Sequence, residues 1–244
     1  MADVWSRGAR IANRLLRRFG CELVRSSNSV SWQSALERIH GMGLQVATVI
    51  DVGASDGRWS RQMQRWFPDA SYLLIEAQAI HEPRLQAYKK RGKNVDYVLA
   101  AAADTCGQVF FNAGDAAGGL ASHSNTNGCT QLVNATTVDS EVRVRHLDAP
   151  FLIKLDTHGF EVPILRGAER TLADTVAICV ETYNFVLCEG CLRFPETCAF
   201  LQDKGFLPIG LVSPLFRRTD GILWQMDLIF ARTDREELHR TKYA

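Results

Sequence analysis

Short apolar runs alternate with stretches of helix length from about residue 46 to the C-terminal region. The runs predict seven strands: Val46–Val52, Ser71–Glu76, Val95–Ala103, Phe151–Leu155, Val176–Glu181, Leu207–Val212 and Leu223–Phe230. Helices are predicted between them at Arg58–Trp66, His81–Arg91, Val162–Leu172 and Pro195–Lys204. This alternation is typical of parallel βαβ units. Because such crossovers are right-handed, we expect a doubly wound α/β sheet with helices on both faces.

Residues 108–138 interrupt this rhythm. Gln108–Phe111 and Val133–Val138 read as extra short strands. The 112–131 stretch between them is rich in glycine and has almost nothing to bury. Loops of this length inside a compact domain often act as lids or binding loops, so we expect this one to cover a ligand.

The N-terminal residues form a different pattern. In residues 4–19, Ile11, Leu15 and Phe19 are spaced by four among five arginines, which predicts a basic amphipathic helix. We therefore divide the chain into an extension, residues 1–30, and a single domain, residues 31–244. We favour a helix packed on its own domain; the alternative is peripheral docking on an anionic membrane surface or a partner.

Composition narrows the class of protein. The 244 residues are 46% hydrophobic and 23% charged, as in an ordinary globular protein, and the net charge is +1. Without a strong positive field, nucleic acid is not expected as the main partner. The odd number of cysteines, the absence of a long apolar run and the lack of a signal-peptide core favour a cytoplasmic setting. The oligomeric state stays open.

The strongest local motif is the segment Val49–Gly57, which runs from an apolar strand into a turn and then a helix. Gly53 and Gly57 let the backbone of this turn, which also contains Ala54 and Ser55, approach a ligand at the carboxyl end of the strand, where open α/β sheets bind ligands.

The acidic residues of this region indicate which cofactor. Dinucleotide folds place glycines where this turn has Asp51 and Asp56. Two carboxylates would repel a pyrophosphate but suit a cofactor that is cationic here, such as S-adenosylmethionine. Glu76 ends the second strand, where a carboxylate can accept hydrogen bonds from both ribose hydroxyls. We expect Asp51 and Glu76 to bind the cofactor together with the four turn residues.

These features, with Thr137–Asp139 and above all Phe151–Ala168, resemble the FkbM-type methyltransferases. The most specific element is Lys-x-Asp-x-x-Gly-x-Glu, residues 154–161, and the resemblance spans roughly residues 45–232. It implies a Rossmann-like class I S-adenosylmethionine-dependent methyltransferase, with seven strands of which the last is antiparallel. Members of this family are mainly O-methyltransferases of sugars and microbial secondary metabolites.

One position departs from the family. A glutamate is usual where this chain has His158, so the role of that glutamate is not carried over. A subset with Asp-x-His-Gly, followed by Glu-x-Tyr-Asn, as at Glu181–Asn184, and by Leu-Trp-Gln-Met-Asp, as at Leu223–Asp227, is more similar.

Methyl transfer to an aliphatic hydroxyl requires removal of its proton as the new bond forms. His158 has a suitable side chain for a general base; the alternative is a structural histidine that caps the following helix. Asp156 can orient His158, hold the cofactor or contact the acceptor. Lys154 shares a strand face with Asp156, so we expect it to form an ion pair with a carboxylate.

Further residues are assigned to the acceptor side. Glu181, Tyr183 and Asn184 follow the fifth strand, with a plain core aromatic as the alternative for Tyr183, and His123 can reach a substrate from the glycine-rich loop. No histidine spacing indicates a metal. The lone Cys-x-x-Cys at residues 188–191 has no second pair, so free thiols are expected there.

The sequence therefore predicts a metal-independent S-adenosylmethionine-dependent O-methyltransferase. Its acceptor would be a small molecule or glycan: a sugar, a glycolipid or a secondary metabolite. Two alternatives stay open: a nicotinamide-dependent oxidoreductase, which shares the strand, glycine turn and distant acid, and a catalytically inactive module that binds cofactor or a partner.

Overall fold

The structure is a computed structural model that describes residues 9, 11–24, 29–114, 118–125, 131–188 and 190–242. Its strands are β1 (Thr48–Val52), β2 (Ser71–Glu76), β3 (Val95–Leu99), β4 (Ala101–Ala102), β5 (Gly107–Asn112), β6 (Leu120–Ser122), β7 (Gln131–Thr136), β8 (Phe151–Leu155), β9 (Thr175–Tyr183), β10 (Phe206–Phe216) and β11 (Leu223–Arg232). Its helices are η1 (Arg17–Phe19), α2 (Trp32–Gly41), α3 (Arg58–Met63), η3 (Ala79–His81), α4 (Glu82–Arg91), α5 (Val138–Arg145), α6 (Glu161–Arg166), α7 (Glu169–Ala173), α8 (Phe194–Asp203) and η4 (Glu236–His239).

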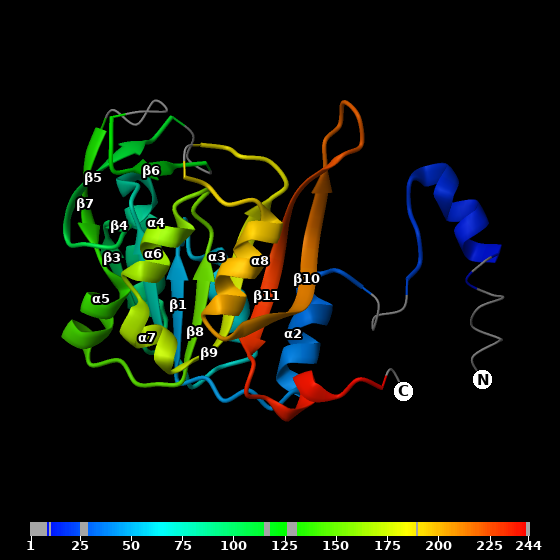
Figure 1. Cartoon of the computed structure of the whole chain (residues 1–244), viewed down its shortest axis with the longest axis horizontal. Helices are drawn as coiled ribbons and strands as arrows, with labels where there is room; N and C mark the ends of the chain where they lie inside the picture. The colour runs from blue at the N-terminus through cyan, green and yellow to red at the C-terminus, as the bar shows by residue number, and fades with distance from the viewer. Residues whose placement is uncertain are drawn as a thin grey trace.

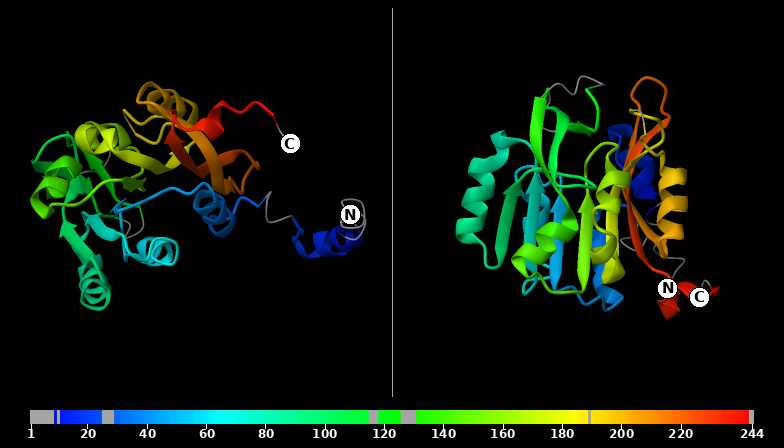
Figure 2. Two further views of the ribbon diagram at one scale, coloured as in Figure 1. Left: turned by 90° about the horizontal axis from the view of Figure 1, so that it is seen from below. Right: turned by 60° about the vertical axis from the view of Figure 1, so that its left-hand side comes forward.

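A seven-stranded main sheet forms the centre of the molecule, in the order β10-β11-β9-β8-β1-β2-β3. β1 pairs in parallel with β2 and β8, whereas β11 pairs antiparallel with both β9 and β10. The expected mostly parallel sheet with an antiparallel last strand is thus confirmed. Figure 2 shows helices on both faces of this sheet.

One apolar core lies on each face. Leu36 of α2, Met63 of α3 and Leu85 of α4 are buried against one face. Leu165 of α6 and Leu201 of α8 are buried against the other. Strands covered on both sides are mostly apolar, which is why their runs were conspicuous in the sequence.

A second sheet, in the order β4-β7-β5-β6, rises beside the carboxyl end of the main sheet (Figure 1). The single strand predicted at Val95–Ala103 is wrong, because β3 pairs with β2 whereas β4 pairs with β7 of the second sheet. The strand predicted at Val133–Val138 also ends early. The Thr137 side chain accepts a hydrogen bond from the Ser140 N–H and caps α5, so Val138 is already helical.

Two further differences concern helices. The helix predicted at Val162–Leu172 is divided into α6 and α7 at Gly167, where an added Cβ would lie 2.0 Å from the Ala103 carbonyl oxygen. Helices α2 and α5 were not predicted. α2 begins after Ser31, whose side chain accepts a hydrogen bond from the Ser34 N–H.

The N-terminal helix stands apart from the α/β body (Figure 1). Residues 1–8 and 10 lie outside the described part, but residues 11–16 are helical and continue into η1. Ile11, Leu15 and Phe19 are all exposed, so the expectation that this helix packs on its own domain is wrong. Among the described residues, no helix is both long enough and apolar enough to cross a bilayer.

Candidate active site

A cavity of about 260 Å³ opens at the carboxyl ends of β1, β2 and β8. This is the edge of an open α/β sheet at which ligands bind. It is surrounded by residues that follow β1, β2, β3 and β8 and by residues of the β5–β6 region. Its lining includes Gly53, Ser55, Glu76, Ala77, Gln78, Ala100, Ala101, Ala102, Phe111, Gly119, Ala121, Asp156, Thr157, His158 and Phe160.

The turn after β1 is clamped between two neighbouring strands. The backbone N–H groups of Gly53 and Ala54 donate to the Ile75 carbonyl at 3.0 and 3.2 Å. Gly53 has φ of +75°, and an added Cβ would lie 2.1 Å from the Asp156 carbonyl oxygen. Only glycine fits at this approach of the β1 turn to the end of β8.

Glu76 provides a buried carboxylate in the cavity wall. Its side chain accepts hydrogen bonds from the backbone N–H groups of Ser55 at 2.6 Å and Gln78 at 2.8 Å. Burial raises the pKa of Glu76, and the two N–H donors oppose that rise. Because each carboxylate oxygen has two lone pairs, Glu76 retains acceptor capacity toward ribose hydroxyls.

Three predicted cofactor residues, Asp51, Ala54 and Gly57, do not line the cavity. The Asp51 carboxylate is fully buried and accepts a hydrogen bond from Ser60 Oγ at 2.6 Å. Gly57 is the N-cap of α3 with φ of +74°, and an added Cβ would lie 3.0 Å from both Leu74 and Tyr88. The close packing of Leu74 and Tyr88 therefore explains why a glycine occupies position 57.

The second turn carboxylate faces arginines. Asp56 lies 3.3 Å from Arg58, 3.8 Å from Arg61 and 3.1 Å from Arg84. Neither Asp51 nor Asp56 lines the cavity. The geometry therefore does not support the expectation that these two carboxylates repel a pyrophosphate there.

Lys154 supplies positive charge beneath the cavity. Its Nζ lies 2.6 Å from Asp156 Oδ2 and 3.6 Å from Asp51 Oδ1, so the expected ion pair is confirmed. Although burial alone would raise the pKa of Asp156, the Lys154 ammonium lowers it below its usual range. Asp156 is thus held as a carboxylate at the cavity wall.

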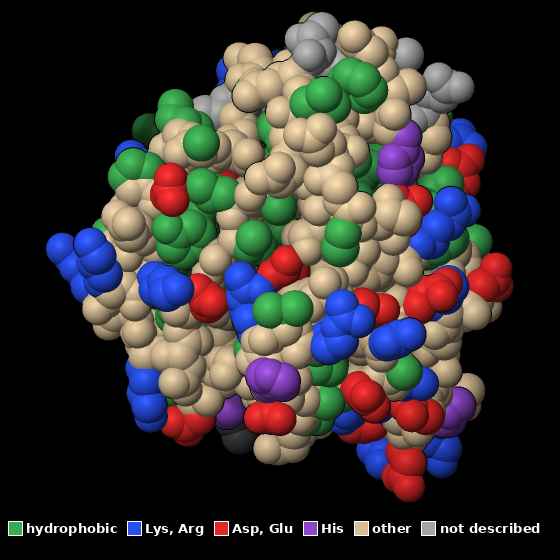
Figure 3. All heavy atoms as spheres, turned by 90° about the vertical axis from the view of Figure 1, so that its left-hand side faces the viewer, with side chains coloured by type: hydrophobic (Ala, Val, Ile, Leu, Met, Phe, Trp, Pro, Cys, Tyr) green, Lys and Arg blue, Asp and Glu red, His purple; other side chains and the backbone are tan. Residues whose placement is uncertain are grey.

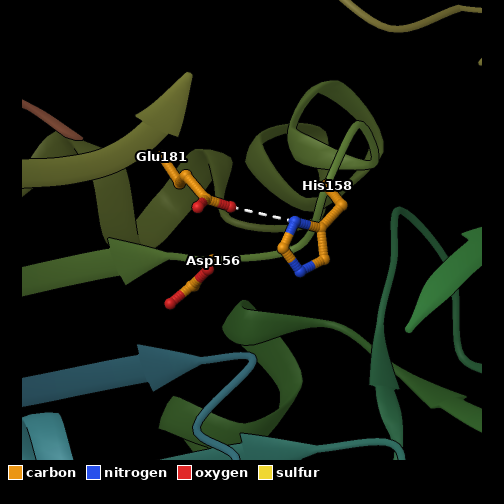
Figure 4. A group of neighbouring side chains, drawn as sticks. All are labelled: Asp156, His158 and Glu181. Atoms are coloured by element: carbon orange, nitrogen blue, oxygen red, sulfur yellow. Dashed lines mark ion pairs between the residues drawn. The ribbon is translucent and has the colours of Figure 1, made fainter. Parts of the chain in front are cut away.

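His158 is held by two groups from β9, of which Figure 4 shows Glu181. Its Nδ1 lies 2.9 Å from Glu181 Oε2 and 2.6 Å from the Tyr183 hydroxyl oxygen. The Tyr183 hydroxyl donates to Glu181 Oε2 at 2.8 Å. Since the phenolic proton goes to Glu181, we assign the proton of a neutral imidazole to Nδ1, which leaves Nε2 as the basic nitrogen.

The turn itself excludes the capping role considered for His158. α6 begins at Glu161 with Phe160 at its N-cap, so His158 lies outside the cap. Instead, Glu161 Oε1 accepts hydrogen bonds from the Gly159 N–H at 2.8 Å and from Thr157 Oγ1 at 3.2 Å. His158 adopts φ of +54°, in the left-handed region.

The remaining predicted acceptor residues, Tyr183, Asn184 and His123, do not line the cavity. The Tyr183 ring is buried. Asn184 donates from Nδ2 to the Leu223 carbonyl and so braces β11. The His123 ring lies 5.1 Å from that of Phe160, a lining residue, and its Nε2 is 3.4 Å from Asp104 Oδ1.

The comparisons with known proteins bear on this site. Residues 51–208 match the methyltransferase FkbM domain. The chain belongs to this family. S-adenosyl-L-methionine is therefore its cofactor, and the protein is an S-adenosylmethionine-dependent methyltransferase of the FkbM family. Membership decides against the nicotinamide-dependent oxidoreductase that the shared turn had left open.

No curated protein matches this FkbM methyltransferase in sequence. Among solved structures, it resembles precorrin-6y C5,15-methyltransferase from Geobacter metallireducens at 14% identity and a TM-score of 0.44, covering 84% of this chain and 91% of that one. It also resembles 1,6-didemethyltoxoflavin-N1-methyltransferase from Burkholderia thailandensis at 12% identity and a TM-score of 0.43, covering 85% of this chain and 80% of that one. A third similar structure is Sp1610 of Streptococcus pneumoniae, a proposed tRNA (m1A22) methyltransferase. Its identity is 14% and its TM-score 0.45, and the match covers 83% of this chain and 71% of that one. Their substrates do not transfer to this chain.

The cofactor fits what the cavity of this FkbM enzyme offers. Glu76 provides a buried acceptor for hydroxyl groups, the Gly53 turn brings backbone to the cavity wall, and Asp156 adds a carboxylate. Sequence reasoning missed Gln78, Phe111 and Phe160, which also line the cavity. Phe111 arrives from the second sheet, and Gly119 makes room for it, since an added Cβ would lie 2.4 Å from the Phe111 ring.

The glycine-rich stretch of the FkbM enzyme contains more structure than expected. β6 lies within it, and Gly119 and Ala121 line the cavity. Residues 115–117 and 126–130 lie outside the described part. A second groove of about 680 Å³ adjoins the cavity and shares Ala77, Gln78 and Phe111 with it.

The Cys-x-x-Cys prediction is wrong for this enzyme. Cys188 and Cys191 form a disulfide, because the turn between them brings their Cα atoms to 5.5 Å. The bond packs on the turn that carries His158: a Cβ added at Gly159 would lie 2.1 Å from Cys191 Sγ.

Asp156, His158 and Glu181 also share a potential for metal binding. Each offers one donor atom, and these atoms lie within 4.8 Å of one another. The Lys154 ammonium, 2.6 Å from Asp156, already supplies a positive charge to this group. A metal-independent reaction stays our prediction.

Proposed function

We propose that this protein is an O-methyltransferase that methylates a hydroxyl group of a sugar, a glycolipid or a secondary metabolite. The observation that carries this proposal is the imidazole of His158 in the cavity wall, with Nδ1 beside Glu181 and Tyr183. An alcohol, unlike a thiolate or a neutral amine, needs a base to remove its proton during transfer.

The residues divide the work between cofactor and acceptor. Bound S-adenosylmethionine supplies a methyl group on a sulfonium. Glu76 accepts hydrogen bonds from the ribose hydroxyls, and the backbone of the Gly53–Ser55 turn packs on the cofactor. The buried Asp51, Ala54 and Gly57 support that turn from behind. Asp156 contributes negative charge near the reacting groups.

His158 takes the acceptor proton at Nε2. Glu181 stabilises the imidazolium that forms, because its carboxylate lies 2.9 Å from Nδ1. Glu181 therefore acts as a positioning residue. Tyr183, Asn184 and His123 surround the acceptor side and shape its approach.

The acceptor is proposed to be a small molecule or glycan, in a cytoplasmic setting. The net charge of +1 offers no overall attraction for a phosphate backbone. Figure 3 shows acidic and basic side chains intermingled on the face that carries β3 and the second sheet, with hydrophobic side chains above them. These features support an acceptor other than nucleic acid.

Replacement of His158 by alanine tests the proposal. We expect His158→Ala to lower kcat by about a hundredfold or more on the acceptor found in a panel of hydroxyl compounds. The affinity for S-adenosylmethionine, measured by titration calorimetry, should change little. His40→Ala, an exposed histidine on α2, is the matched control.

Unchanged turnover of His158→Ala would remove the general base from the mechanism. Cofactor binding by the wild type without transfer to any hydroxyl acceptor would favour the inactive module. Transfer to an amine or to RNA alone would overturn the O-methyltransferase assignment.

A further inference from the structure

Residues 11–24 form a small unit, here named the N-terminal hook. Its helix ends at Gly20, which has φ of +69°. The Asn13 side chain then donates to the Leu23 carbonyl at 2.9 Å and accepts from the Leu23 N–H at 2.6 Å. These two bonds fold the segment after the helix back along it, so the hook is held by its own contacts.

The hook displays apolar side chains to solvent. At roughly 100° per residue, its apolar helix positions fall within an arc of about 140°. Five large apolar side chains are half exposed or more: Ile11 70%, Leu15 60%, Phe19 81%, Leu23 50% and Val24 57%. A group of this kind in so short a segment marks an interaction surface.

The charges of the hook indicate the chemistry of its partner. Arg14, Arg17 and Arg18 are exposed on the remaining arc of the helix. Glu22 pairs with Arg17 at 3.0 Å, which leaves Arg14 and Arg18 without compensation inside the hook. A basic face beside an apolar face is the composition of helices that lie in the interface of anionic membranes.

A second exposed apolar group lies at the same edge of the main sheet. Val30, just before α2, lies beside β10, where the Ser213 N–H donates to the Val30 carbonyl at 2.8 Å. The β10–β11 hairpin exposes Leu215 and Phe216, which are followed directly by Arg217 and Arg218. Apolar and basic residues thus recur together at the β10 edge.

We propose that the N-terminal hook docks this protein on an anionic lipid bilayer. Ile11, Leu15 and Phe19 enter the boundary between headgroups and acyl chains, while Arg14 and Arg18 contact lipid phosphates. The hairpin end, with Phe216 and Arg218, provides a second contact. The helix lies in the membrane plane, and this proposal does not depend on the identity of the methyl acceptor.

The test is co-sedimentation of the full chain with vesicles of three parts phosphatidylcholine to one part phosphatidylglycerol. We expect the wild type to pellet with these vesicles and to remain in solution with phosphatidylcholine alone, and binding should weaken as salt rises. Leu15→Ser with Phe19→Ser, and separately Arg14→Glu with Arg18→Glu, should each weaken binding by about tenfold or more.

Two control proteins match these variants. Val144→Ser removes an equally exposed apolar side chain on α5, and Lys90→Glu with Arg91→Glu reverses two exposed charges on α4. Both should pellet like the wild type. Equal pelleting of wild type and hook variants would overturn the proposal. So would a dimer in solution that the hook variants convert to monomer while none of the proteins binds vesicles.

Discussion

Lys154 lies among four carboxylates beneath the cavity. Asp51 and Asp156 contact it directly, and Glu181 of β9 stands opposite Asp227 of β11 in the antiparallel pair. Burial, followed by the charges of Glu181 and Asp156, raises the pKa of Asp227 to about 7. Asp227 therefore changes its protonation state near neutral pH.

Asp227 should make stability depend on pH. Because its folded pKa of about 7 exceeds the ordinary value of 3.8, its stabilising contribution is complete below about pH 4 and is lost as pH rises through 7. Between about pH 5 and pH 8, we expect the unfolding free energy of the wild type to fall relative to Asp227→Asn by up to about 3 kcal/mol.

Urea unfolding at both pH values measures this difference. The exposed Asp203→Asn on α8 should keep the pH dependence of the wild type. If the Asp227→Asn and wild-type curves run parallel, Asp227 is ionised in the folded protein throughout this range.

Glu181 should affect turnover more than binding. Replacement by glutamine keeps the shape of the side chain but removes the charge beside His158 Nδ1. We expect Glu181→Gln to lower kcat about tenfold to a hundredfold and to alter the pH profile of kcat, with KM for the acceptor little changed. The exposed Glu37→Gln is the control. A rise in KM with normal kcat would instead make Glu181 a group that binds the acceptor.

Among the elements, the turn between β1 and α3 sets the shape of the cavity. It is joined to β2 through Ile75 and pressed on the end of β8 at Asp156. Displacement of this turn would move Ser55, Glu76 and Asp156 relative to one another.

Gly53→Ala tests this coupling. The added Cβ must displace the Asp156 carbonyl, so we expect a loss of stability well above about 1 kcal/mol together with weaker binding of S-adenosylmethionine. Gly43→Ala is a matched control, because Gly43 also has positive φ, +66°, but nothing within 4 Å of an added Cβ. Thermal unfolding and calorimetry measure both effects. Equal losses in the two variants would show that backbone strain alone accounts for them.

The strands of the main sheet were readable in the sequence because strands covered on both faces are continuous apolar runs. The step from β3 to β4 was not, since Val95–Ala103 stays apolar while the chain passes from one sheet to the other. The break at Gly167 depends on a distant carbonyl, that of Ala103. Tertiary contacts of this kind leave little trace in local periodicity.

The residues of the site were likewise predictable only as far as local sequence motifs place them. Gly53, Ser55, Glu76, Asp156 and His158 were placed at strand ends by their position in the motifs, and all five line the cavity. The Asp51 side chain lies on the same sheet face as Lys154 of the neighbouring strand and is directed toward Ser60 of α3, which the sequence motif alone did not reveal.

The hydrogen bond from Gln225 to Glu181 could not be predicted from local sequence patterns. It depends on the register of β11 against β9. No pattern in the sequence around either residue contains that register.

At the scale of the whole molecule, the cofactor cavity lies where two sheets meet. The main sheet provides Gly53, Glu76 and Asp156, and the second sheet brings Phe111 and Ala121 over them. The family match begins at residue 51 and ends at residue 208, so the hook and β11 fall outside it. The division of the chain at residue 30 stays a prediction.

The position of β11 has a consequence for synthesis of the chain. β10 joins the main sheet only through β11, which inserts between it and β9. On the ribosome β10 emerges first, with no strand to pair with, and the sheet cannot close until Leu223–Arg232 has followed. A chain that stops before Leu223 lacks an interior strand and leaves two unpaired edges, which are sites of aggregation. It also lacks Gln225, so the hydrogen bond that Gln225 donates to Glu181 forms only once β11 has been made.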